Sequence, residues 1–212
     1  GVWADGQFAW VDSPGWTREL RYKRDTLVSE VRLRHERLGL ELVCHDAVDY
    51  YSPVFFRKVT VCDLLGHARD VRLFFHADLS VGESPVGDTV AYDPSTGGLV
   101  HYKDERYFLF NGLHPGGWGI GSWATGQKRI GDAEGTWRDA EDGLLSRNAI
   151  AQGSVDSTVG FHLPVAAAQV LRGTTGLVIG DTLWIAEGPD LAAGTVVRVS
   201  SAKQEVLFVE HV

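Results

Sequence analysis

The sequence predicts an all-β protein: a large antiparallel β-sandwich (a supersandwich) with a small β extension at its C-terminal end. Short segments in which apolar and polar residues alternate follow one another along most of the chain, as half-buried strands do. Turn sequences rich in Gly and Pro separate them, as in Ser13–Gly15 and His114–Gly117. No stretch keeps the 3.6-residue helical period over three turns, so packed sheets are the predicted architecture.

The elements follow in order from this alternation and from β-branched and aromatic residues. Gly1–Asp5 is strand-like, and the later predicted strands of the sandwich span residues 26–34, 39–45, 54–64, 69–76, 88–92, 98–103 and 106–111. Charged residues on alternate positions predict one solvated face per sheet. Short helices are predicted at Asp139–Asn148 and Val165–Leu171.

A domain boundary is predicted near Pro164, which divides the chain into residues 1–164 and 165–212. Three short strands are expected after it, at Gly176–Ala186, Gly194–Ser200 and Glu205–Val212. Because this tail is too short to bury much core of its own, we expect it to dock on the sandwich or to pack in an oligomer.

Composition and charge narrow the classes of protein and partner. Of the 212 residues, 44% are hydrophobic and 23% charged, which is ordinary for a soluble globular protein. A net charge of -8 argues against nucleic acid and against an anionic membrane surface. No apolar run approaches the roughly 20 residues that span a bilayer, and no signal pattern is visible. The chain starts with Gly and contains no Met, so we expect it to be cut from a longer polypeptide.

The cysteines Cys44 and Cys62 are predicted to be free thiols. They would lie near each other in a hairpin centred on Pro53. However, Cys44 lies on the same face of its strand as Leu42, whereas Cys62 lies on the opposite face of its strand from Val61, so the two thiols would point apart if both apolar faces line one core. Two free thiols predict a reducing compartment, hence the cytoplasm. Nothing in the sequence marks either thiol as an activated nucleophile.

The segment Trp118–Ser157 is the most informative, because it combines Gly, Trp and carboxylates. An indole can cover the apolar face of a sugar ring while carboxylates accept from its hydroxyls. The candidate substrate-binding residues are Trp118, Trp123, Trp137, Asp139, Glu141 and Asp142. The alternative interpretations are that the tryptophans pack within the sandwich or on a partner domain, and that the carboxylates bond local backbone N–H groups.

The sequence predicts no catalytic residue, metal site or cofactor. In an extended strand Asp139 and Glu141 would lie about 6.6–6.8 Å apart, within reach of the carboxyl separation of about 6.5–9.5 Å that inverting glycosidases use, but any Asp-x-Glu in a strand satisfies this. The histidines lack metal-ligand spacing. The acidic residues of the expected loops are better explained as turn caps than as calcium ligands; these are Asp78, Asp88, Asp93 and Asp156.

Six collinear phrases carry a family resemblance, among them GVWADGQFAWVDSPGW at residues 1–16, GTWRDAEDG at 135–143 and IAQGSVDSTVGFHL at 150–163. With them, residues 1 to about 164 resemble the N-terminal β-sandwich domain of prokaryotic glucoamylase-type enzymes, glycoside hydrolase family fifteen. The resemblance implies a sandwich that precedes a helical (α/α)-barrel, which hydrolyses terminal α-glucosidic bonds with inversion through two glutamates. No such glutamate can be carried onto this sequence. The tail resembles the last strands of the OB-fold domain that ends NfeD-type membrane-associated proteins.

The main functional hypothesis is therefore a non-catalytic accessory domain. Its partners would be the catalytic barrel and an α-glucan oligosaccharide at the border of the substrate cleft. One alternative is a free-standing carbohydrate-binding module. Another is an assembly domain whose tail forms homo-oligomers through a β edge. The last is a stand-alone hydrolase that uses Asp139 and Glu141.

Overall fold

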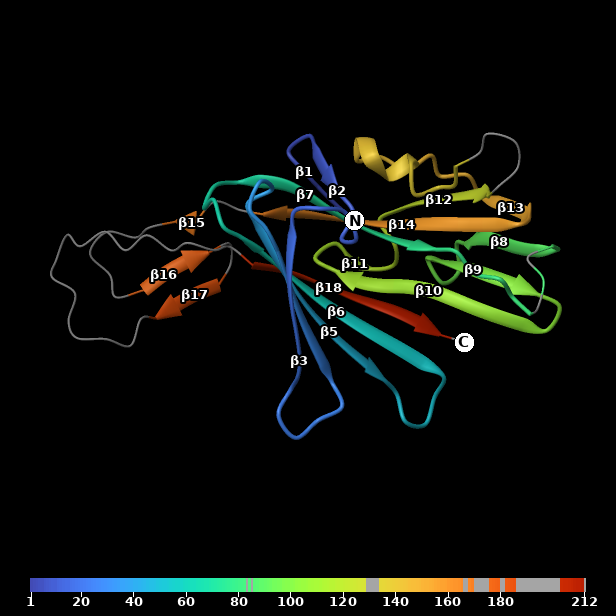
Figure 1. Cartoon of the computed structure of the whole chain (residues 1–212), viewed down its shortest axis with the longest axis horizontal. Coiled ribbons are helices and arrows are strands. Elements are labelled where there is room, and N and C mark those ends of the chain that lie inside the picture. The colour runs from blue at the N-terminus through green and yellow to red at the C-terminus, as the bar shows by residue number, and fades with distance from the viewer. Residues whose placement is uncertain are drawn as a thin grey trace, which may run out of the picture.

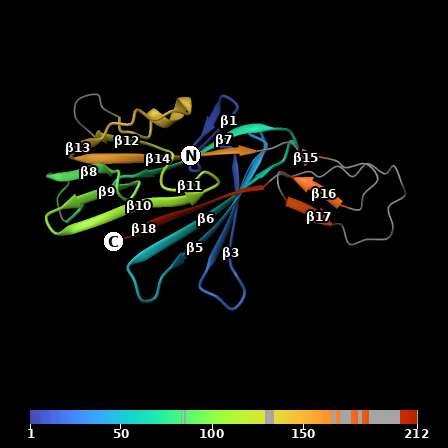
Figure 2. The same cartoon turned by 180° about the vertical axis from the view of Figure 1, so that it is seen from behind.

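The computed structural model describes residues 1–82, 84, 86–128 and 134–165, and beyond them the strand backbones at 168–169, 176–179, 182–185 and 203–211. Within these ranges the strands form three antiparallel sheets, which confirms the predicted all-β class. Two of the sheets stack as a sandwich, and the third projects from one end of it (Figure 1). Figure 2 shows the same layers from behind.

The smaller layer, here called the small sheet, has the described strand order β12-β14-β7-β1-β2. Its strands are β12 (Ser122–Gln127), β14 (Val155–Val165), β7 (Arg69–Ala77), β1 (Val2–Ala4) and β2 (Gln7–Ala9). The strand β14 pairs with β7 from Ser157 opposite Ala77 to Val165 opposite Arg69. On the other edge of β7, only the Val71–Leu73 part pairs with β1.

The other layer, the large sheet, has the described order β13-β8-β9-β10-β18-β6-β5-β4-β3. Its strands are β13 (Ile150–Gly153), β8 (Asp88–Asp93), β9 (Gly98–Lys103), β10 (Arg106–His114), β18 (Lys203–His211), β6 (Val54–Asp63), β5 (Leu40–Val48), β4 (Ser29–His35) and β3 (Trp16–Tyr22). The short β11 (Gly117–Trp118) pairs with β10. The projecting third sheet contains β15 (Ala168–Gln169), β16 (Gly176–Ile179) and β17 (Thr182–Ile185).

The main core lies between the two layers, with Leu40, Val61, Leu99 and Phe161 among its fully buried side chains. A second apolar cluster packs on the other side of the small sheet and contains Phe74, Ala124, Ala140 and Leu145. The small sheet is therefore covered on both faces, which explains why β14 is buried at every position from Val155 to Phe161.

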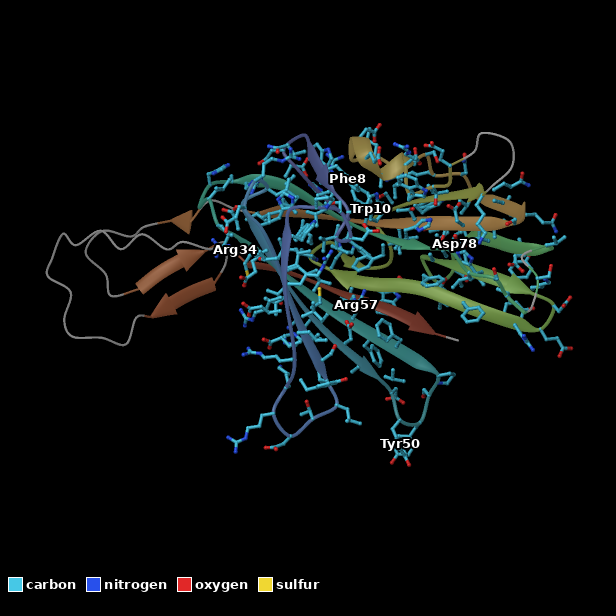
Figure 3. All side chains as sticks on the ribbon, in the orientation of Figure 1. Phe8, Trp10, Arg34, Tyr50, Arg57 and Asp78 are labelled. Carbon is cyan, nitrogen blue, oxygen red and sulfur yellow. The ribbon has the colours of Figure 1, made fainter. Side chains whose placement is uncertain are left out.

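The end of the large sheet formed by β3–β6 shows the alternation that predicted it. On one face, charged side chains line up across the strands, and Arg21 and His45 both bond to Glu30. The opposite face continues the core, but it becomes exposed toward the hairpin ends, where Leu20 is 72% exposed. Figure 3 shows these hairpins extending beyond the small sheet, with Tyr50 at a tip.

The predicted strands of residues 1–111 are present, with small shifts of their ends. Six described strands before residue 166 were not predicted: β2, β3, β11, β12, β13 and β14. The predicted helix at Asp139–Asn148 is reduced to the 3-10 helix η1 (Asp139–Asp142), because Gly143 adopts a left-handed conformation with φ 86° and ends it.

The region after residue 164 differs from the prediction in several ways. The predicted helix at Val165–Leu171 is wrong where the chain is described, since Val165 ends β14 and Ala168–Gln169 is a strand. Pro164, near which the domain boundary was predicted, is the last but one residue of β14 and pairs with Asp70. The predicted single strand Gly176–Ala186 is two strands, β16 and β17, which pair with each other. The predicted strand Gly194–Ser200 lies outside the described residues. The strand β18 pairs with β6 on one side and β10 on the other, so both its edges are filled within the chain.

Both cysteines are buried and neither forms a disulfide. Cys44 pairs with Val59 and Cys62 with Glu41, so the predicted difference in side-chain parity holds. Burial raises the pKa of the Cys44 thiol to about 11, which keeps it protonated at neutral pH. Within the described ranges, no helix has both the length and the apolar character needed to cross a membrane.

Candidate functional site

The segment of residues 135–147 carries four of the six predicted sugar-binding residues, and it packs across the outer face of the small sheet. Ala140 of η1 is fully buried in the second apolar cluster. Leu145 is buried in the same cluster, and Trp3 packs against it. The segment is thus held by apolar contacts on both sides of Gly143, and its polar side chains are positioned from there.

Trp123 does not present a free stacking face. Its ring lies parallel to that of Tyr92, with the centroids 3.7 Å apart and an interplanar angle of 4°. The guanidinium of Arg147 lies over the indole at 5.5 Å from its centroid, and the indole N–H donates to the Asn148 carbonyl at 3.1 Å. Trp123 therefore joins β12 to the large sheet by packing, as the alternative interpretation of the tryptophans predicts.

Trp137 lines a cavity that lies between the two sheets. Its indole N–H donates to the Glu134 carbonyl, and the guanidinium of Arg138 lies over its ring at 4.7 Å. Trp118, in contrast, lies on β11 of the large sheet, where its side chain is 61% exposed. The structure therefore does not bring the three tryptophans together on one platform.

The three candidate carboxylates each have a partner within the segment. Asp139 accepts from the Ser146 N–H at 2.7 Å, and Asp142 accepts from the Leu144 N–H at 2.8 Å. Glu141 pairs with Arg138 at 3.4 Å. The expectation that Asp139 and Glu141 share one face of an extended strand is wrong, because both belong to the 3-10 helix, which has about three residues per turn.

Asp156 is the buried polar centre beneath this segment, and its role in the site was not predicted. Its carboxylate accepts from the Thr136 N–H at 2.8 Å and lies 3.0 Å from His76 Nε2. Gly135 approaches so closely that an added Cβ would lie 2.5 Å from Asp156 Oδ2, and its φ of +99° is one that side chains rarely adopt. Asp156 thus anchors the start of the segment to β14 and β7.

On the opposite face of β14, Ser157 points into the space between the sheets and lies 2.7 Å from His101 Nε2. His101 is 1% exposed. Burial lowers the pKa of the His101 imidazole to about 4, although the Asp156 charge acts in the opposite direction. An imidazole that is neutral at pH 7 and has so low a pKa is a weak general base, so the pair is best explained as a satisfied polar contact in the core.

A cavity of about 980 Å³ opens beside the edge of β7, between the two sheets. Apolar side chains from both sheets line its interior: Leu33, Leu42, Val59, Leu73, Phe75, Phe110 and Val159. Trp10, Trp137 and His76 also line it, with the exposed Asp12 and Asp78 at its mouth. Figure 3 shows Trp10 and Asp78 along the small sheet, with Arg57 on the large sheet. The cavity is in the volume range of ligand sites.

The described residues contain no group of three or more His, Cys, Asp or Glu side chains placed to hold a metal ion. The acidic residues that were expected in loops have other partners, and two of them, Asp88 and Asp93, are the first and last residues of β8. Asp93 accepts from the Ser95 N–H at 3.0 Å, as a turn cap does. Asp88 accepts from the Val81 N–H at 3.1 Å, and Asp78 pairs with Lys128.

No family model matches the sequence, and no curated protein matches it. Among solved structures, the chain is similar to a bacterial glucoamylase complexed with acarbose, with a TM-score of 0.56 at 10% sequence identity. The match covers 94% of this chain and 24% of that chain, so this chain spans about a quarter of the glucoamylase's length. At this identity the likeness shows the fold, and it agrees with the sandwich that the sequence resemblance implies.

Proposed function

We propose that this chain is a non-catalytic β-sandwich domain of a glucoamylase-like glycoside hydrolase acting on α-glucans, and that it supports an (α/α)-barrel catalytic domain. The observation that carries the proposal is the fold likeness, which takes in nearly all of this chain but about a quarter of the glucoamylase. The larger part of such an enzyme lies elsewhere, and the chemistry belongs to that part in this proposal.

The internal bonding of the candidate carboxylates supports a non-catalytic role. Inverting glycoside hydrolysis needs two carboxyl groups that face one substrate, one to donate a proton and one to accept a proton from water. Asp139 and Asp142 instead accept from main-chain N–H groups, and Glu141 pairs with Arg138. These contacts fit side chains that hold a loop in shape.

Exposed apolar side chains at the β3–β6 end supply a surface for the barrel. Leu20, Tyr22 and Val48 are exposed on the face that continues the core, and Tyr50 and Tyr51 are exposed at the adjacent hairpin tip. Apolar residues gathered in this way mark interaction surfaces. In this proposal they pack against the catalytic barrel.

The experiment that tests the proposal is an activity assay of the isolated chain with maltotetraose, with wild type beside Glu141→Gln. We expect no glucose release from either protein. In the full-length enzyme, replacing Tyr50 and Tyr51 by Ser should lower the Tm of the barrel. Glucose release that Glu141→Gln abolishes, or a barrel Tm unchanged by the tyrosine variants, contradicts the respective half of the proposal.

One observation favours a second candidate, a carbohydrate-binding module. The indole of Trp118 is 61% exposed on a strand, and such a face can stack on a glucose ring. This function predicts saturable heat of binding with maltotetraose that is lost in Trp118→Ala and kept in Trp123→Ala, since Tyr92 already covers Trp123. Binding that survives Trp118→Ala excludes this site.

A further inference from the structure

A second, smaller cavity of about 340 Å³ lies on the outer face of the small sheet. The strands β7, β14 and β12 supply one wall of it through Arg72, His162 and Ser122. The chain that follows η1 supplies the other wall with residues 143–145 and 147, and Figure 1 shows η1 and this stretch over the small sheet. The volume of the cavity is at the lower end of the range of small-molecule sites.

The first of two arginines in this cavity is held in a fixed place. The guanidinium of Arg72 donates from Nη2 to Asp70 at 2.7 Å and from Nη1 to the Gly143 carbonyl at 2.7 Å. It also lies over the Trp3 ring at 4.5 Å. A third bond runs from Nε to Asp70. Since a guanidinium has five N–H groups, Arg72 keeps two that these bonds do not use.

The second arginine, Arg147, has an unusual backbone. Its φ is 58°, a value that is uncommon for residues other than Gly, Asn and Asp, and its N–H donates to the Trp123 carbonyl at 2.8 Å. Its guanidinium lies over the Trp123 ring and donates from Nη2 to the Gly121 carbonyl at 3.2 Å. Strained backbone of this kind is found where a side chain is positioned for function. The side chain leaves further N–H groups for a ligand.

The charge of this cavity has the opposite sign to the charge of the whole chain, which is -8. Among the described residues, Arg72, Arg147 and His162 line the cavity and no carboxylate does. Asp70 lies outside the lining and pairs with both Arg72 and His162. The two guanidinium charges exceed the single charge of Asp70 by one, so the cavity suits a ligand with one negative charge.

The rest of the lining shows that the ligand has an apolar part. Apolar side chains complete the walls, namely Phe74, Leu144, Leu145 and Phe161. The Ser122 hydroxyl has no partner among the described residues and adds one donor beside the arginines. Small-molecule sites typically combine apolar walls with a few polar groups in this way.

We propose that this cavity binds a small organic carboxylate, with the carboxylate between Arg72 and Arg147 and an apolar body against Phe74 and Leu145. A neutral ligand would leave the guanidinium charges unmatched. A phosphate monoester carries about -1.5 to -2 charges at neutral pH, which is more than the cavity balances. This inference stands apart from the proposed function and holds or fails without it.

The test is a titration of the full chain with 4-fluorobenzoate, followed by 19F NMR. We expect saturable binding with a Kd of about 1 mM, as suits a ligand of this size. The variant is Arg147→Gln, and the matched control is Arg24→Gln, which removes the same charge at a side chain that is 96% exposed. We expect Arg147→Gln to weaken binding by about tenfold and Arg24→Gln to change it by less than about twofold.

A second arm uses the wild-type chain alone, so it decides the matter even if Arg147→Gln alters the loop. It compares 4-fluorobenzoate with 4-fluorobenzyl alcohol, which has the same ring without the charge, and we expect the alcohol to bind about tenfold more weakly. Equal binding of the two overturns the proposal, as does the absence of saturation by the carboxylate up to about 20 mM. Equal losses in Arg147→Gln and Arg24→Gln overturn the site. Binding of 4-fluorophenyl phosphate that is more than about tenfold tighter overturns the carboxylate assignment.

Discussion

The indole of Trp123 lies parallel to the phenol ring of Tyr92, with 3.7 Å between centroids. Trp123 belongs to β12 of the small sheet and Tyr92 to β8 of the large sheet. One stacked pair thus fastens the two layers at the end where β12 and β8 lie. Trp123, which the sequence suggests as a residue that stacks on a sugar ring, therefore links the two sheets.

Trp123→Ala should therefore destabilise the fold. Loss of a largely buried indole leaves a cavity, and we expect the free energy of unfolding to fall by about 2–4 kcal/mol. The matched control is Trp118→Ala, an exposed site where a change below about 0.5 kcal/mol is expected. Urea unfolding of the three proteins measures both values, and equal losses at the two sites contradict the assignment.

Gly135→Ala should be destabilising for two reasons. The residue has φ +99°, and the added Cβ would lie 2.5 Å from Asp156 Oδ2, so we expect a loss of about 2–3 kcal/mol. Gly6→Ala is the control, because Gly6 has a similar φ of +87° but open space around it, and about 1 kcal/mol is expected there. Thermal unfolding that ranks Gly6→Ala as the more harmful change contradicts the close approach of Gly135 to Asp156.

Because of Glu30, the free energy of unfolding should fall at acidic pH. The hydrogen bond with His45, followed by those from Arg21 and Arg32, lowers the pKa of the Glu30 carboxyl from 4.5 to about 2. The folded state then holds the charged form more strongly than the unfolded state does. This stability is complete above pH 4.5 and is lost as the pH falls toward 2. In a Tm series from pH 5 to pH 2, Glu30→Gln should show a shallower decline than wild type, and parallel curves speak against the role.

His101 should act in a different pH window. Burial lowers the pKa of its imidazole from 6.5 to about 4, so between these values the unfolded state takes up a proton that the folded state excludes. Stability should fall as the pH drops from 6.5 to 4 and should lose nothing more from this group below 4. His101→Asn should flatten that interval of the Tm curve, whereas an unchanged slope between pH 6.5 and 4 would rule out His101 as the cause.

The sequence predicts the fold class and most strands because alternation is a local signal. The strands β4 to β10 alternate strongly, and each was predicted near its observed position. The strand β14 escaped prediction because both its faces are covered, which buries Asp156, Ser157 and Thr158 as fully as their apolar neighbours. A buried strand with polar residues has neither an alternating pattern nor an apolar run.

The candidate site was predicted less well, since it depends on contacts between distant segments. The sequence marks the Trp-rich and acidic segment, but not that Tyr92 covers Trp123 or that Asp156 anchors Thr136. Predicting the cavity beside β7 likewise requires knowing that the end of the β1 ladder lies next to the inner face of β5 and β6. The one local clue was the Gly-Ser-Val-Asp-Ser sequence, Gly153–Ser157, where small and acidic residues interrupt a β-rich region.

The proposal of a non-catalytic domain is tested most directly by incubating the purified chain with maltotetraose and assaying released glucose, with Glu141→Gln as the paired variant. The proposal predicts no glucose above the rate of a buffer blank from either protein. Glucose release by wild type that disappears in Glu141→Gln would contradict it and would place catalysis in the Asp139–Asp142 segment.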